Sequence, residues 1–148
     1  MLGLKWRCLA AIPLPPKKTI EEHAATQAQF LQTNLEPLLA ARQTAPLLVD
    51  CLSLWLTAAM DDCGAWDDAT WAAGGEAELR SRTAGLVSAW RSTPRRVVAV
   101  SNEVGSGVVP ATASGRRFRD TLGELNQRLA ATADEVWLVT AGIPRRLR

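Results

Sequence analysis

The stretch VVAVSNEVGSGVVPATASGRRFRD, residues 97–120, decides the fold. It opens with four apolar residues, Val97–Val100, which is the pattern of a strand covered on both faces. Two glycines and a proline then indicate a loop. Beyond the loop, apolar residues recur at helical spacing and predict an amphipathic helix: Phe118, Leu122, Leu125 and Leu129. Asn102 and Glu103 therefore stand at the carboxyl end of a strand, the edge at which open α/β sheets bind their ligands.

The rest of the chain alternates helical and strand patterns. Apolar runs predict two further strands, at Leu47–Val49 and Val136–Val139. Helical periodicity predicts helices from Thr19 up to a break at residues 44–46, from Leu52 through Trp55, and over residues 76–91. Strands separated by helices pair in parallel. The sequence therefore predicts an α/β domain whose parallel sheet is flanked by helices.

Two segments carry finer expectations. Thr19 is expected to cap the first helix, and Pro37 to kink that helix or end it early. Residues 61–75 are rich in aspartate and glycine and predict a long polar loop. Because Trp66 and Trp71 lie inside it, this loop is expected to pack on something, either the edge of the sheet or a second subunit.

Length and composition restrict the class of protein. With 148 residues and a net charge of +2, the chain is one domain or most of one, and nothing favours a nucleic-acid partner. The arginines 145, 146 and 148 are expected to form a solvated tail. No apolar stretch approaches the roughly 20 residues of a membrane span. The three cysteines have no C-x-x-C spacing and predict neither a zinc site nor a disulfide framework, which favours the cytoplasm: Cys8, Cys51 and Cys63.

Several strings occur in an order that resembles one enzyme family. They are LLVDCLSLWL (47–56), SNEVGSGVVP (101–110), RRFRD (116–120), NQRLA (126–130) and ADEVWLVTAGIP (133–144). From about Thr19 to the C-terminus, the chain is similar to the bifunctional adenosylcobinamide kinase/adenosylcobinamide-phosphate guanylyltransferases of cobalamin biosynthesis. The resemblance implies a P-loop NTPase-like (RecA-like) domain over residues 19–148, truncated at its N-terminus and preceded by an atypical leader, residues 1–18. It also implies adenosylcobinamide as substrate, ATP, GTP and Mg²⁺ as cofactors, and a homotrimer.

Two features of that family are missing from the printed sequence. A phosphate loop needs the pattern G-x-x-x-x-G-K-[ST], whereas residues 1–18 contain one glycine, Gly3. The single histidine, His23, follows the Thr19-Ile-Glu-Glu segment and does not align with the histidine that carries the nucleotidyl group in the family. We therefore expect no catalytic residue in this chain and poor activity. The alternative to an enzyme is an inactive truncated homologue that retains only the fold or a partner-binding role.

Four polar residues are candidates for the site. The resemblance implies that Glu21 and Asp50 contact the nucleotide, while Asn102 and Glu103 are expected to contact substrate or magnesium-bound water. Each has a structural alternative. A glutamate in a first helical turn is favoured by the helix dipole, and Asp50 is equally suited to cap a helix that begins at Leu52. Asn102 and Glu103 would also suit a capped turn.

Charged and amide residues on the helix near Phe118 carry separate expectations. Its apolar stripe is expected to lie against the sheet, with Arg119 in solvent. Arg116 stands four residues before Asp120, a spacing that permits a helix ion pair. Arg119 and Asp120 are adjacent in sequence and are expected to point to different sides. Asn126 and Gln127 are expected to hydrogen-bond the neighbouring backbone.

Overall fold

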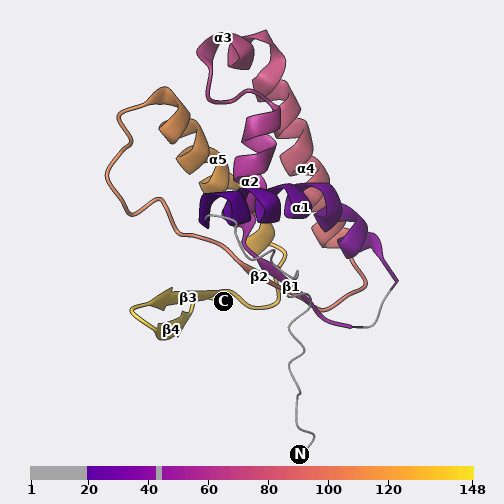
Figure 1. The fold of residues 1–148 in the computed structure, drawn as a ribbon. Coiled ribbons are helices and arrows are strands. Elements are labelled where there is room, and N and C mark those ends of the chain that lie inside the picture. Colours follow the sequence, from indigo (N-terminus) through magenta and orange to yellow (C-terminus); the bar gives the residue numbers. More distant parts are fainter. Residues whose placement is uncertain (1–19, 43–44) are drawn as a thin grey trace, which may run out of the picture.

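The computed structural model describes residues 20–42 and 45–148, with side chains from residue 27 onward (Figure 1). Its elements, in order, are α1 (Ile20–Ala40), β1 (Leu47–Asp50), α2 (Leu52–Asp62), α3 (Asp68–Thr70), the π-helical turn η1 (Trp71–Gly75), α4 (Glu76–Ser92), β2 (Val97–Val100), α5 (Ala113–Ala130), β3 (Trp137–Thr140) and β4 (Ile143–Arg146). Thr19 and the leader, residues 1–18, lie outside the described residues.

Strands β1 and β2 form a parallel pair, in register from Leu47 opposite Val97 to Asp50 opposite Val100. The prediction of a mixed α/β fold with parallel strands is confirmed. One face of this pair is buried beneath the helices through Leu47 and Val49. The other face stays open, since Leu48, Val98 and Val100 are 54%, 49% and 42% exposed. The expectation that Val97–Val100 is covered on both faces is therefore wrong for the described residues.

The last predicted strand does not join the parallel pair. It forms β3, which pairs antiparallel with β4 in a hairpin, and in Figure 1 this hairpin projects beside the main body. The reason lies in the two-residue turn: Ala141 has φ 50° and Gly142 has φ 78°. Positive φ at both central positions is the type I′ geometry that closes a tight hairpin. An apolar run that suited a parallel strand therefore pairs with its own C-terminal neighbour.

The core lies between helices α1, α2, α4 and α5 and the buried face of β1. Its largest fully buried side chains are Leu35 and Leu39 of α1, Val49 of β1, Trp55, Leu56 and Met60 of α2, Leu79 and Leu86 of α4, and Leu122 and Leu125 of α5. The predicted stripe of α5 is thus buried, with Phe118 partly so. However, α5 packs mainly against α2 and α4 rather than against the sheet.

Helix α1 continues through Pro37 to Ala40, so the expected early end is wrong. Leu35 and Leu39 flank the proline and are 1% and 0% exposed. Burying such side chains contributes about 1.5–3 kcal/mol each. This gain offsets the cost of a proline in a helix, which is about 3 kcal/mol.

The predicted loop over residues 61–75 is also largely helical. Asp67 caps α3, because its carboxylate accepts hydrogen bonds from the Thr70 amide and hydroxyl, both at 2.8 Å. Trp71 packs against the core, with the Arg117 guanidinium 5.0 Å from its ring centre. The packing expected of Trp71 is confirmed, whereas Trp66 is exposed and its indole N–H donates to the Asp61 carboxylate.

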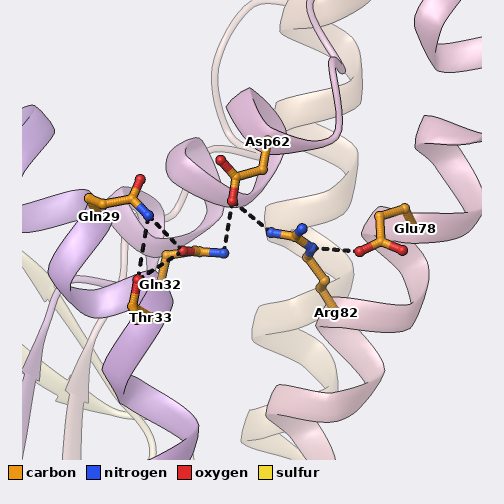
Figure 2. Close-up of polar contacts among 6 residues, drawn as sticks. All are labelled: Gln29, Gln32, Thr33, Asp62, Glu78 and Arg82. Atoms are coloured by element: carbon orange, nitrogen blue, oxygen red, sulfur yellow. Dashed lines mark hydrogen bonds and ion pairs between the residues drawn. The ribbon is translucent and has the colours of Figure 1, made fainter.

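A polar network joins three helices at the end of α2 (Figure 2). The Asp62 carboxylate of α2 accepts from Gln32 Nε2 of α1 and from Arg82 Nη1 of α4, both at 2.9 Å. Arg82 Nε also donates to Glu78 at 2.8 Å. Two hydrogen bonds raise the pKa of Arg82 above its usual range, and the bond to Glu78 contributes more than the bond to Asp62. Arg82 therefore remains charged and ties α4 to α2.

Arginines also fasten the amino ends of the strands and the C-terminus. Arg95 is only 7% exposed, and its guanidinium donates to the carbonyls of Leu38 (2.9 Å) and Ala45 (2.8 Å). Arg148 donates to Ala130 and Ala131 at the end of α5 (3.1 and 2.9 Å), and Arg146 lies 3.6 Å from Glu135. The three arginines of this tail are nevertheless exposed, so the expectation of a solvated C-terminal tail is confirmed.

Candidate functional site

The candidate residues meet at the carboxyl edge of β1 and β2. Asp50 is the last residue of β1, and the parallel register places it opposite Val100, the last residue of β2. Asn102 and Glu103 follow two and three residues later. The predicted placement of these three residues at one end of a parallel sheet is confirmed. This edge is where α/β proteins bind ligands.

Asp50 is exposed and faces the open side of the strand pair. Strand side chains alternate between faces, so Asp50 shares its face with Leu48 while Val49 points into the core. The alternative role as a helix cap is wrong, because α2 begins at Leu52 and its cap position is Cys51. No residue in the described part of the chain hydrogen-bonds the Asp50 carboxylate. Among the described residues, this carboxylate is thus exposed at the end of β1.

The loop after β2 is closed by its own glutamate. The Glu103 carboxylate accepts a hydrogen bond from the Gly105 amide at 2.7 Å, so the capped-turn alternative applies to this side chain in the structure. A Cβ at position 105 would lie 2.8 Å from the same carboxylate oxygen, so a larger residue there would require the Glu103 side chain to move. The side chain of Asn102 is exposed.

Asn126 on α5 holds the start of this loop. Its Nδ2 donates to the Asn102 carbonyl at 3.1 Å, and its Oδ1 accepts from the Ser101 hydroxyl at 2.6 Å. The expectation that Asn126 bonds backbone near the site is confirmed, whereas Gln127 is exposed and has no side-chain bond to a described residue. The role of Ser101 was not predicted, although a polar residue directly after an apolar strand is a signal for it.

The charged side chains in the first half of α5 have other hydrogen-bond partners than the sequence predicts. Arg119 is only partly exposed, and its Nε and Nη2 both donate to Asp120 at 3.0 Å, so the expected separation of these neighbours is wrong. The long arginine side chain spans the angle between adjacent helical positions. Arg116 instead donates to the carbonyls of Pro110 and Ala111, both at 2.9 Å. The ion pair that its spacing from Asp120 permits is not formed.

A shallow polar depression of about 440 Å³ adjoins this loop. It is lined by Gly105, Arg119, Asp120, Gly123, Glu124 and Gln127. A Cβ added at Gly123 would meet nothing within 4 Å, so this helical glycine faces open space. The depression therefore lies between the loop after β2 and the middle of α5.

Glu21 and His23 fall within the first turns of α1. Their side chains lie outside the described residues, so the role of Glu21 stays a prediction. The described residues include no group of three or more His, Cys, Asp or Glu side chains arranged to hold a metal ion. Cys51 and Cys63 are free thiols, and burial raises the pKa of Cys63. Among helices in the described ranges, none has both the length and the apolar character that crossing a bilayer requires.

A parallel strand pair with a helical connection and polar residues at its carboxyl edge defines a mixed α/β protein. Residues 17–147 match the cobinamide kinase / cobinamide phosphate guanyltransferase family (CobU), and the chain belongs to this family. The family resemblance identified from the sequence is therefore confirmed.

Three relatives are similar over much of the chain. Over 108 residues the chain is 38% identical to the bifunctional adenosylcobalamin biosynthesis protein CobU of Escherichia coli, covering 69% of this chain and 58% of the relative. The figures for CobU of Salmonella typhimurium are the same. Over 140 residues it is 36% identical to the bifunctional adenosylcobalamin biosynthesis protein CobP of Pseudomonas aeruginosa, covering 88% of this chain and 73% of the relative. The chain thus spans under two thirds of the length of the first two relatives.

Proposed function

We propose that the chain binds a magnesium–nucleotide and adenosylcobinamide at the carboxyl edge of β1 and β2. This binding would serve the kinase and guanylyl-transfer reactions for which its family is described. The observation that carries the proposal is Asp50, an exposed carboxylate at the end of a parallel strand, beside the Asn102–Glu103 segment. By the same resemblance, we propose a P-loop NTPase-like domain, a homotrimer and a cytoplasmic location.

The donor set suits magnesium that arrives with a nucleotide. Mg²⁺ keeps several waters and is commonly held by one or two carboxylates together with substrate phosphates. Asp50 offers one exposed carboxylate, and Glu103 offers a second once its bond to Gly105 is released. Asp50 would hold the ion, directly or through water. When bound, the ion neutralises phosphate charge that a carboxylate alone would repel.

The kinase reaction, the first of the two, requires positioning more than covalent help from the protein. In the first, the aminopropanol hydroxyl of adenosylcobinamide attacks the terminal phosphorus of ATP or GTP; a P–O bond forms, the bond to the bridging oxygen breaks, and the hydroxyl proton passes to solvent. In the second, the resemblance implies two displacements: a histidine attacks the α-phosphorus of GTP and pyrophosphate leaves, and the new phosphate then takes the nucleotidyl group, which breaks the P–N bond and restores the histidine. His23 does not align with that histidine. Asn102 supplies an amide that can orient substrate hydroxyl or phosphate oxygens. Glu21 is proposed to contact the nucleotide.

A second candidate function is binding without catalysis. It is favoured by one observation: the 148 printed residues contain no G-x-x-x-x-G-K-[ST] pattern and a single histidine, His23. Loop amides and a lysine normally cradle the phosphates. A nucleophile cannot be replaced by binding energy alone. A polypeptide of these residues is therefore expected to bind nucleotide weakly and to turn over little.

One experiment separates these candidates. Purified protein is incubated with adenosylcobinamide, GTP and Mg²⁺, products are followed by chromatography, and Mg–GTP binding is measured by calorimetry. We expect weak binding that Asp50→Asn reduces and Asp134→Asn does not, because Asp134 is an exposed carboxylate beyond the end of α5. Turnover near that of a relative would contradict the second candidate. Absence of Mg–GTP and adenosylcobinamide binding would refute the proposed site.

A further inference from the structure

A single side chain on α5 fastens the loop that carries Asn102 and Glu103. We propose that Asn126 is a positioning residue for the candidate site. By bonding the Ser101 hydroxyl and the Asn102 carbonyl, it fixes the directions in which the next side chains leave the end of β2. The significance of these directions for ligands rests on the function proposed above, whereas the hold on the loop can be tested without any ligand.

The two bonds of Asn126 constrain each other. Its Oδ1 accepts from the Ser101 hydroxyl at 2.6 Å while its Nδ2 donates to the Asn102 carbonyl at 3.1 Å. With the amide reversed, its oxygen would face the Asn102 carbonyl oxygen, and two acceptors would oppose each other. The side chain therefore has one favourable orientation. In that orientation, the peptide plane between Asn102 and Glu103 is fixed.

The helix that supplies Asn126 is itself firmly seated. Leu122 and Leu125 are 0% and 1% exposed, and Asn126 follows directly after Leu125. On the other side, the loop is anchored by Val104, which packs against the core, and by the Glu103–Gly105 hydrogen bond at 2.7 Å. Loss of Asn126 would leave the Asn102 carbonyl to water and free the peptide plane to rotate. The Asn102 and Glu103 side chains would then sample several directions.

The test measures hydrogen exchange of the Gly105 amide, which the Glu103 carboxylate protects in the closed loop. Asn126→Ala should raise this exchange by about fivefold, the factor for one hydrogen bond of ordinary net strength. The buried Leu125 amide reports global unfolding in the same sample. A merely structural role for Asn126 would raise exchange at both amides together, whereas positioning predicts a selective rise at Gly105.

Three variants sharpen the comparison. Asn126→Asp retains the acceptor for Ser101 but loses the donor to Asn102, so it should loosen the loop, whereas Ser101→Ala should loosen it less. Asn34→Ala is the matched control, because Asn34 also donates to a backbone carbonyl, that of Phe30 at 2.9 Å, but within α1. This control should leave the Gly105 amide unchanged. A Ser101→Ala effect equal to or larger than that of Asn126→Asp would overturn the proposed anchor.

Calorimetry with Mg–GTP and with adenosylcobinamide then links the loop to binding. Where wild-type protein binds, Asn126→Ala should weaken the affinity for at least one of these ligands by about fivefold. Unchanged affinities for both, with a loosened loop, would overturn positioning. If wild-type protein binds neither ligand, the proposed function fails. The hold of Asn126 on the loop is then decided by the exchange data alone, and an unaltered Gly105 amide would refute it.

Discussion

Truncation of Leu122 to alanine should strongly destabilise the protein. This side chain is 0% exposed on α5, between α2 and α4. Leu→Ala removes three carbons, and at about 0.8 kcal/mol for each buried carbon the transfer cost is about 2.4 kcal/mol. The cavity left behind raises the total into the range of about 2–5 kcal/mol. Such a loss is large beside the roughly 5–15 kcal/mol of a typical domain.

Urea unfolding followed by tryptophan fluorescence measures this loss. The transition midpoint should fall while the slope stays constant, because the area exposed on unfolding hardly changes. Glu124→Ala is the matched control, since Glu124 lies two residues away on the exposed side of the same helix and should change the free energy by no more than about 0.5 kcal/mol. A loss well under about 1 kcal/mol for Leu122→Ala would show that the stripe of α5 faces solvent or a partner in solution.

Two further predictions concern polar groups outside the site. Hydrogen bonds from Thr70, chiefly from its backbone amide and secondly from its hydroxyl, hold the pKa of Asp67 below its usual range. This cap therefore stabilises α3 fully above the unfolded pKa, and the stabilisation is lost as the pH falls through the lower folded pKa. An NMR titration of Asp67 should show the lowered pKa, and Asp67→Asn should remove this pH dependence of stability. Arg82→Met should lower the free energy of unfolding by about 1 kcal/mol, because Arg82 is only partly exposed and bonds Asp62 on another helix. Urea unfolding measures this loss. Arg80→Met, which removes an exposed pair within α4, should cost about 0.3–0.5 kcal/mol, and equal losses would contradict the network in Figure 2.

The parallel strand pair and its polar edge could be predicted because their signals are local. An apolar run followed by a polar residue marks a strand end, and helical connections favour parallel pairing. Asp50 and Asn102 were therefore placed correctly. The same reasoning failed for Val136–Val139, because an apolar run does not specify its partner. The partner was decided by the backbone at Ala141 and Gly142, whose positive φ values turn the chain back at once.

Side-chain partners were harder to predict than strand ends because they depend on reach in three dimensions. Arg119 was expected to avoid Asp120 on the basis of helical angles, yet a flexible side chain bridges that angle at 3.0 Å. No pattern in the sequence indicated a structural role for Arg95. Its buried guanidinium joins α1 to the strands by donating to the Leu38 and Ala45 carbonyls, which lie about 50 residues away in sequence. Helical spacing identifies faces of a helix, while these contacts depend on how neighbouring elements pack.

Helix α5 links the core to the candidate site, because it carries both the buried leucines and Asn126. The buried positions of Leu122 and Leu125 fix the rotation of α5 about its own axis. Asn126 follows Leu125 and reaches the end of β2, so the packing of the leucines determines where its amide can bond. A change that rotates α5 would move Asn126 away from the Asn102 carbonyl even if the site residues were intact. The orientation of the candidate site is therefore set by the core that α5 forms with α2 and α4, as well as by the strands that carry it.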